Sequence, residues 1–236
     1  MNPPCFCLDF EATGVIPTQD KPVQACLVSR QSGTDRILMN TLVNPCRTID
    51  PGSTAVHGIT DAMVRFAPDY AWVAWQISQI VAQGEAGSFM VSFNGSNYDI
   101  PMLDMCLGRP GVTIPQVDVL RFARRHFAEL RGSQGGKKLG ELYEIFLGRS
   151  LVGAHDAAVD VLATLDLLEA MQERAQVGLA ELAEEQSQPR AWPIMAIGKY
   201  IGLPVAEVPR SWAAFMSTRQ DLDPDLRATV DAMLAR

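Results

Sequence analysis

Short apolar stretches, the first of them alternating with polar residues, predict five β-strands in this chain. They cover residues 5–10, 24–30, 36–42, 88–93 and 116–119. The first stretch stops at Ala12-Thr13-Gly14, a predicted turn. Ser32 and Gly33 lie between the second and third stretches and predict a hairpin-like connection.

Between and after these strands, apolar residues recur at helical spacing. Helices are predicted over residues 60–63, 70–83, 100–107, 120–130 and 139–147, with a long one from about residue 156 to beyond 168. Trp72 and Trp75 belong to the apolar pattern of the second of these. Residues 44–52, which contain two prolines, are predicted to form a loop.

The order of these elements predicts the fold class. Three neighbouring strands followed by alternating helices and strands indicate an α/β fold, with a mixed five-stranded sheet flanked by helices. Residues rich in Ala, Glu and Gln continue the last helix, with a break at Gly178. We expect a first domain over residues 1–174, a helical linker over 175–190 and a small C-terminal module over 191–236.

Composition places the chain among soluble globular proteins. Hydrophobic residues make up 47% and charged residues 20%. No apolar stretch is long enough to span a bilayer, and the N-terminus lacks a signal-peptide pattern, so we expect a cytoplasmic protein with no membrane partner. The five cysteines include no C-x-x-C pair, which favours buried thiols over disulfides or a zinc site.

A net charge of −7 speaks at face value against a nucleic-acid partner, although one groove can differ from the whole surface. Residues 121–138 contain six basic side chains and one acidic one. The basic ones are Arg121, Arg124, Arg125, Arg131, Lys137 and Lys138. This segment either follows a phosphate backbone or is a solvated helix face and loop.

Several carboxylates stand at positions where a cation would stabilise them. Asp9 and Glu11 alternate on the first strand, so both side chains face the same side of the sheet. Asp99 follows the fourth strand, while Asp160 lies near the start of the long helix, five residues after His155. Taken singly, each has an ordinary interpretation as a solvated acid, a helix cap or a structural histidine.

In combination, these residues resemble the exonuclease motifs of the DnaQ-like (DEDD) superfamily. The motifs occur in the family's order over residues 5–170, as D-x-E, N-x-x-x-Y-D and H-x-x-x-x-D, supported by FEATG, HGITD, DVLRFARR and LGELYEIFLG. The chain is similar to replicase proofreading subunits and to exodeoxyribonuclease X-like proteins. His155 marks the histidine (DEDDh) branch, because Asp156 stands where the other branch has tyrosine. Asn94 departs mildly from the family, since it precedes Asp99 by five residues instead of four.

The resemblance implies a ribonuclease H-like fold and hydrolysis of phosphodiester bonds from the 3′ end of a strand. The implied ligands of two Mg²⁺ or Mn²⁺ ions are Asp9, Glu11, Asp99 and Asp160, with His155 as the general base that activates water. The implied substrate contacts are Ala12, Thr13, Gly14, His57, Asn94 and Tyr98. His57 keeps an alternative interpretation as a core or capping histidine.

The leading expectation is a repair or proofreading nuclease that acts on single-stranded or 3′-ended DNA. An RNA-trimming exoribonuclease similar to oligoribonuclease is the alternative, since no residue type reports contact with a 2′-hydroxyl. A catalytically inactive nucleic-acid-binding module is the third. The C-terminal module resembles a small domain found behind some exonucleases, and Lys199 and Tyr200 could contact nucleic acid there. A packing or oligomer role is equally open, so a homodimer stays possible.

Overall fold

The computed structural model of the protein describes residues 3–127, 130, 138–219 and 222–236. The strands are β1 (Cys5–Ala12), β2 (Pro22–Gln31), β3 (Thr34–Leu42), β4 (Phe89–Ser92) and β5 (Gln116–Asp118). The helices are α1 (Pro51–His57), α2 (Asp61–Val64), α3 (Tyr70–Ala82), α4 (Asp99–Leu107), α5 (Val119–His126), α6 (Leu139–Leu147), α7 (Ala157–Ala175), α8 (Leu179–Ser187), α9 (Arg210–Ser217) and α10 (Pro224–Leu234). Two short 3₁₀ turns, η2 (Gly198–Tyr200) and η3 (Val205–Glu207), precede α9.

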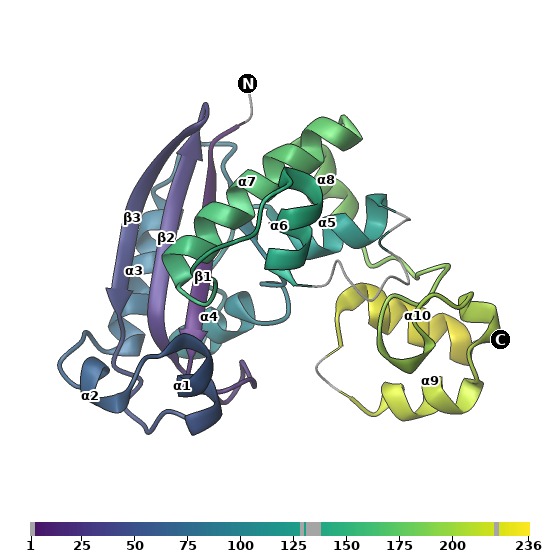
Figure 1. Cartoon of the computed structure of the whole chain (residues 1–236), viewed down its shortest axis with the longest axis horizontal. Helices are drawn as coiled ribbons and strands as arrows, with labels where there is room; N and C mark the ends of the chain where they lie inside the picture. Colours follow the sequence, from purple (N-terminus) through teal and green to yellow (C-terminus); the bar gives the residue numbers. More distant parts are fainter. Residues whose placement is uncertain (1–2, 128–129, 131–137, 220–221) are drawn as a thin grey trace.

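The five strands form one mixed sheet in the order β3-β2-β1-β4-β5. β1, β2 and β3 pair antiparallel, whereas β1 pairs with β4, and β4 with β5, in parallel. This confirms the predicted mixed five-stranded sheet with helices on both faces (Figure 1). The central strand β1 pairs with β2 from Cys5 to Ala12, whereas β4 pairs with it only from Cys5 to Cys7.

Residues of β1 alternate between two hydrophobic cores. Phe6, Leu8 and Phe10 pack with residues of α3 and α4 on one face of the sheet. Cys5 and Cys7 pack on the other face with residues of α5, α6, α7 and α8. Because side chains alternate along a strand, the next two odd-numbered residues, both acidic, also face the α7 side.

Helix α1 begins at Pro51, inside the segment 44–52 that the sequence predicted to be a loop. Asp50 caps it by accepting a hydrogen bond from the Gly52 amide at 2.7 Å, and Pro51 occupies the first helical position. None of its residues is buried, so the segment has no apolar periodicity to reveal a helix.

Helix α3 forms as predicted, but its buried stripe differs from the predicted one. Val73, Ile77 and Val81 are buried, whereas Trp72 and Trp75 are 50% and 48% exposed. Residues four apart share one helix face, and the two indoles lie on the opposite, half-exposed side of the helix.

The predicted break at Gly178 is confirmed, because α7 ends at Ala175 and Gly178 is the N-cap of α8. Leu179 and Leu182 of α8 are buried in the same core as α7. We therefore propose that α8 belongs to the first unit instead of serving as a linker.

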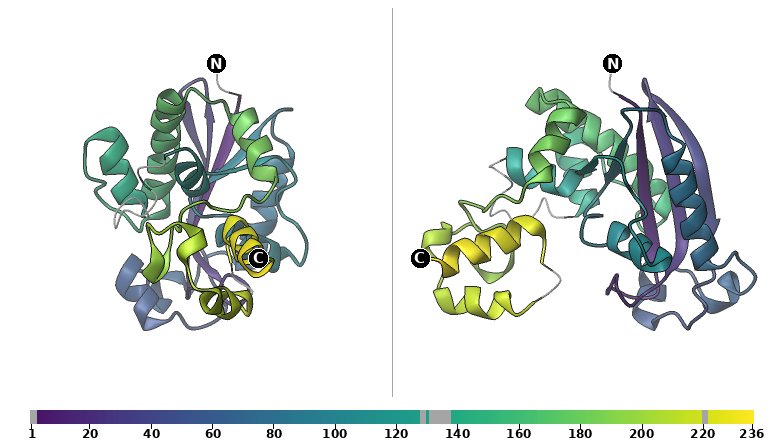
Figure 2. Two further views of the ribbon diagram at one scale, coloured as in Figure 1. Left: turned by 90° about the vertical axis from the view of Figure 1, so that its right-hand side faces the viewer. Right: turned by 180° about the vertical axis from the view of Figure 1, so that it is seen from behind.

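The C-terminal module, residues 191–236, has a hydrophobic core of its own. Its buried members include Trp192, Met195, Val205, Ala213, Met216, Leu226, Val230 and Met233. Figure 2 shows this module beside the sheet unit, connected through the chain that follows α8.

Two predictions from composition can be compared with the structure. None of the helices within the described ranges has the length and apolar character needed to cross a membrane. Cys5, Cys7 and Cys26 are buried free thiols, as predicted, but Cys46 is exposed. Burial raises the pKa of Cys5 to about 11, which keeps this thiol protonated and unreactive.

Candidate active site

The candidate site lies at the edge of the sheet where the parallel strands end. β1, β4 and β5 run in the same direction, so their carboxyl ends meet at one edge. Asp9 and Glu11 come from the end of β1, Asp99 begins α4 just after β4, and Asp160 lies in the first turn of α7. The structure thus gathers the four predicted carboxylates from three elements.

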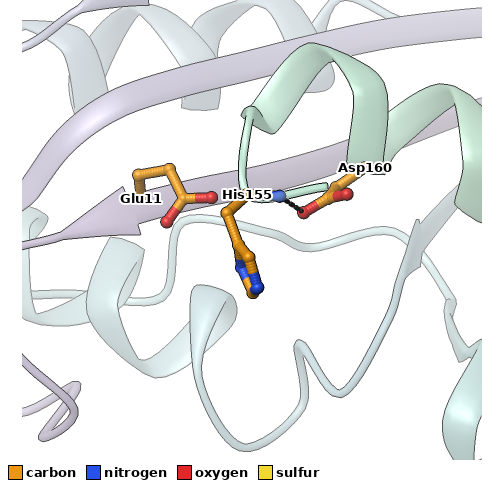
Figure 3. Close-up of side chains that lie close together, drawn as sticks. All are labelled: Glu11, His155 and Asp160. Carbon is orange, nitrogen blue, oxygen red and sulfur yellow. Dashed lines mark hydrogen bonds between the residues drawn. The ribbon is translucent and has the colours of Figure 1, made fainter. Parts of the chain in front are cut away.

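Three of the predicted catalytic side chains come close together at the N-terminus of α7. Carboxylate oxygens of Glu11 and Asp160 and a ring nitrogen of His155 all lie within 4.8 Å of one another (Figure 3). The His155 amide donates to Asp160 Oδ2 at 3.1 Å, which holds His155 in a left-handed backbone conformation with φ of 68°. Asp156 caps α7 as predicted, accepting from the amides of Ala158 and Val159.

Asp99 lies deeper than the other three acids. Its side chain is buried, and Asp99 Oδ1 accepts a hydrogen bond from the Phe10 amide at 2.9 Å. This bond ties the start of α4 directly to β1. Asp99, the predicted ligand of the second ion, is therefore positioned by the backbone of the strand that carries Asp9 and Glu11.

Burial raises the pKa of every carboxyl in this group, and repulsion from neighbouring carboxylates adds to the effect. Burial first, then Asp160 and Asp99, raise the pKa of Glu11 to about 7, and burial raises that of Asp99 to about 7. Burial, followed by Asp99 and Asp160, raises the pKa of Asp9 well above its ordinary value. Burial also raises that of Asp160.

These residues fit a divalent cation. Asp160 Oδ1 is buried and has no hydrogen-bond partner, which leaves a negative oxygen in need of a ligand. None of the ion pairs found among the described residues involves the four carboxylates. A donor set dominated by carboxylate oxygens suits Mg²⁺ or Mn²⁺.

A cavity of about 630 Å³, here called the active-site cavity, opens over these groups. Its wall includes Asp9, Asp99 and His155, together with Asn94 and Tyr98 from the loop before α4. Further lining residues come from α6 and from the segment between α6 and α7. Four of the five predicted catalytic residues thus face a space large enough to admit part of a nucleic-acid strand, and Glu11 lies outside its lining.

A second cavity of about 320 Å³, here called the turn cavity, lies next to Glu11. Ala12, Gly14, His57 and Tyr98 line it, so the structure brings together four of the six predicted substrate contacts. His57 Nε2 lies 3.2 Å from the Ala12 carbonyl, and His57 Nδ1 accepts from an amide. These bonds require a neutral imidazole with the proton on Nε2.

Thr13, another predicted substrate contact, does not line the turn cavity. Its hydroxyl donates to Asp20, its amide donates to the Lys21 carbonyl at 2.9 Å, and its carbonyl accepts from the Asp50 amide at 3.0 Å. All of its polar groups are used within the protein, so Thr13 shapes the turn.

Asp118 is a residue whose importance the sequence did not indicate beyond its place in DVLRFARR. Its buried carboxylate accepts from the amides of Leu120 and Arg121, which caps α5. The same carboxylate accepts from the Asn94 amide at 3.0 Å and from the Ser96 hydroxyl at 2.6 Å. It therefore fastens the loop that leads to Asp99; an Asp before a helix was the one local signal.

Two arginines of the basic segment fit neither of the interpretations that the sequence left open. Arg121 and Arg125 are buried and bind Asp225 at 2.6 and 2.7 Å, so neither interpretation from the sequence holds for them. Their partner lies about a hundred residues away in the chain, where no local pattern reveals it. Arg131 and Lys137 lie outside the described residues.

Comparison with known proteins decides the family. The RNase_T family model, described as "Exonuclease", matches residues 6–168. The chain belongs to this exonuclease family. The match confirms the resemblance to the DnaQ-like superfamily and covers each of the five predicted catalytic residues.

Two relatives of this exonuclease domain differ in how much of their length it represents. A "DNA polymerase III subunit epsilon-like protein" of Rhodobacter capsulatus is 37% identical over 118 residues, covering 42% of this chain and 16% of that protein. An "uncharacterized exonuclease CP81" of Escherichia phage 186 is 30% identical over 175 residues, covering 70% of this chain and 86% of that protein. The chain thus spans a small part of the first relative and most of the second.

Among solved structures, the exonuclease domain is similar to "Exonuclease X in complex with 5′ overhanging duplex DNA". The TM-score is 0.58 at 21% identity, covering 76% of this chain and 98% of that one. At this identity the similarity concerns the fold, and it confirms the ribonuclease H-like sheet predicted from the sequence.

Proposed function

We propose that this protein is a metal-dependent 3′→5′ exonuclease that removes nucleotides from DNA, with single strands as its main substrate. The observation that carries the proposal is the oxygen cluster at the sheet edge, in which Asp160 Oδ1 is buried without a partner. It lies inside the region that matches the exonuclease family. The names of the related replicase subunit and of the DNA complex support DNA as the substrate.

Asp9, Glu11, Asp99 and Asp160 are proposed to hold two Mg²⁺ or Mn²⁺ ions. Following the family resemblance, Asp9 would be shared by both, Glu11 and Asp160 would complete one site, and Asp99 would hold the other. When bound, such cations would supply an activated water and neutralise charge on the leaving oxygen. The raised carboxyl pKa values support this assignment, because each acid gains most from a nearby positive charge.

His155 is proposed to take the proton from the attacking water. Its ring lies beside Glu11 and Asp160 and opens on the active-site cavity. Imidazole is the side chain that most often serves as general base. Attack at phosphorus would release the terminal nucleotide, and the 3′-oxygen of the preceding nucleotide would leave.

The turn cavity is proposed to hold the terminal nucleotide. Ala12, Gly14 and His57 form its floor and wall, and Tyr98 separates it from the active-site cavity while lining both. Tyr98 also donates its hydroxyl to the Gly14 carbonyl, which makes this boundary rigid. Asn94, which lines the active-site cavity, is proposed to contact the nucleic-acid strand there.

A side-by-side digestion tests the proposal. Matched DNA and RNA oligonucleotides, each with a free or a blocked 3′ end, are incubated with the protein and Mg²⁺. We expect free single-stranded DNA to shorten fastest and blocked strands to stay intact. Faster loss of RNA would replace DNA with RNA as the substrate, and cleavage of blocked strands would contradict the 3′→5′ polarity. A duplex with a recessed 3′ end tests the strand preference.

A further inference from the structure

A third cavity lies between the exonuclease domain and the C-terminal module. It measures about 310 Å³, and its wall includes Asn94 and Arg124 from the domain and Trp192, Arg219 and Asp223 from the module. Residues more than a hundred positions apart in the chain thus form one hollow. This space, here called the module cavity, has no role in the catalytic account above.

The three cavities follow one another around the catalytic residues. Tyr98 lines both the turn cavity and the active-site cavity. Asn94 lines both the active-site cavity and the module cavity. A strand whose terminal nucleotide occupies the turn cavity would therefore pass the carboxylates and meet the module cavity next.

The wall of the module cavity has the chemistry that binds single-stranded nucleic acid. Two arginines and one aspartate leave it with a net positive charge. The Arg124 guanidinium lies over the Trp192 ring, 5.7 Å from its centroid, and Asp223 lies 3.5 Å from Arg124. Guanidinium groups pair with phosphates. Trp192 is only 6% exposed, so it supports Arg124 and is not itself a stacking surface for a base. Trp192 Nε1 is also buried without a hydrogen-bond partner.

The module is held against the domain by buried charge-assisted bonds. Asp225 is fully buried, and its carboxylate accepts from Arg121 at 2.6 Å and from Arg125 at 2.7 and 2.8 Å. Asn97, in the loop before Asp99, also donates to Asp223 at 3.4 Å. These bonds fix the far wall of the cavity relative to the catalytic loop, so the cavity is preorganised.

We propose that the module cavity binds the nucleotides on the 5′ side of the scissile bond, so that the C-terminal module forms part of the substrate track. This inference rests on the proposed exonuclease function, because the direction of the strand follows from it. The occupant is the same single strand whose 3′ end is being removed. The module then acts on substrate affinity and leaves the chemical step to the carboxylates.

The test compares Arg219→Gln with Arg210→Gln, a matched control on the module whose arginine bonds to the Leu234 carbonyl and does not line the cavity. Arg219 is exposed, so its replacement should leave the fold intact. Steady-state rates with Mg²⁺ are measured on oligothymidylates from the dinucleotide to the dodecanucleotide, over a range of salt concentrations.

For Arg219→Gln we expect KM on the dodecanucleotide to rise roughly tenfold and its salt dependence to fall by about one ion, with the defect shrinking as the substrate shortens. Arg210→Gln should match the wild type. The same length dependence in all three proteins would overturn the proposal.

A small phosphodiester, the p-nitrophenyl ester of thymidine 5′-phosphate, separates this inference from the function on which it rests. It carries one nucleotide, so it engages the catalytic residues and the turn cavity but does not reach the module cavity. If the wild type cleaves it while Arg219→Gln shows no length-dependent defect, only the substrate track is wrong. If the wild type cleaves neither this ester nor any oligonucleotide, the exonuclease proposal fails and the track fails with it.

Discussion

Asp160 divides its two carboxylate oxygens between two tasks. Oδ2 accepts the His155 amide and holds that residue in the left-handed region, while Oδ1 is buried and open to a ligand. One side chain thus links the position of the proposed base to the position of the proposed cation. Replacing Asp160 should therefore affect both metal binding and proton transfer. Only a residue that is not a metal ligand can be replaced to test proton transfer separately.

His155→Ala makes that separation. If His155 is the general base, kcat should fall by roughly 10²- to 10⁴-fold, while Mn²⁺ affinity changes by no more than about twofold. Single-turnover digestion and calorimetric titration measure the two quantities. His126→Ala is the control, since His126, at the end of α5, pairs with Glu185 of α8 at 2.7 Å. A large loss of Mn²⁺ affinity in His155→Ala would make the residue a metal ligand instead.

The carboxyl pKa values predict how stability depends on pH. Folding raises the pKa of Glu11 from 4.5 to about 7 and that of Asp99 from 3.8 to about 7, so the native state binds more protons than the unfolded state between about pH 4 and 7. Stability in EDTA should therefore fall as pH rises through this window. Thermal unfolding should show a decreasing Tm, and saturating Mg²⁺ should restore it at pH 8.

Asp9→Asn provides the matched control for this pH dependence, because it removes one charge from the group without changing its shape. In EDTA at pH 8 the variant should have a higher Tm than the wild type, and Mg²⁺ should stabilise it less. A wild-type Tm that rises with pH across the window would show that the acids are not repelling one another.

At the scale of elements, the sequence predicted those features that local patterns encode. The alternation along β1 places Asp9 and Glu11 on one face, and Asp156 marks the start of α7. Helix α1 was missed because its cap and proline are present without any buried residue. The ion pairs of Arg121 and Arg125 could not be predicted, since their partner belongs to α10.

The loop between β4 and α4 shows how one buried residue can serve the site without touching substrate. Asp118 accepts bonds from Asn94 and Ser96 in this loop, and Gly95 approaches so closely that an added Cβ would lie 2.3 Å from Ser92 and 3.2 Å from Asp99 Oδ2. These contacts hold the loop in one conformation, and they hold Asp99, which follows the loop, in place with it.

Asp118→Asn should loosen this loop. The asparagine side chain keeps one acceptor oxygen, but its NH₂ group faces N–H and O–H donors of the loop. We therefore expect the free energy of unfolding to fall by about 1–3 kcal/mol. A misplaced Asp99 should also lower kcat by roughly ten- to a hundredfold. Denaturant unfolding and initial digestion rates measure both.

Asp104→Asn is the matched control, because Asp104 accepts from the Gly111 amide at 2.7 Å and has no bond to the loop. It should lose stability while keeping a normal kcat. If Asp118→Asn behaves in the same way, its role is structural only and it does not position Asp99.

At the scale of the whole molecule, a buried charge network joins two hydrophobic cores. Hydrogen bonds from Arg125 and Arg121 outweigh the effect of burial and lower the pKa of Asp225 to about 2. The carboxylate is therefore ionised at any physiological pH. Because the two arginines are themselves nearly buried, removing this charge leaves both without compensation.

Asp225→Asn is accordingly expected to destabilise the protein by about 3–5 kcal/mol. Asp231→Asn, an exposed position on the same helix, should change stability by less than about 0.5 kcal/mol. Urea unfolding of the two variants measures the difference. Equal stabilities would mean that the module is not held by this network.

The exonuclease family and the fold rest on matches over residues 6–168, while the chemistry rests on four carboxylates and one histidine inside that region. A ladder assay on a 5′-labelled DNA strand tests that chemistry most directly, with the wild type and Asp9→Asn each incubated in Mg²⁺ and in EDTA. Stepwise shortening from the 3′ end by the wild type in Mg²⁺ alone is the predicted result. Equal shortening in EDTA, or by Asp9→Asn, would contradict the assignment of these residues as a metal-dependent exonuclease site.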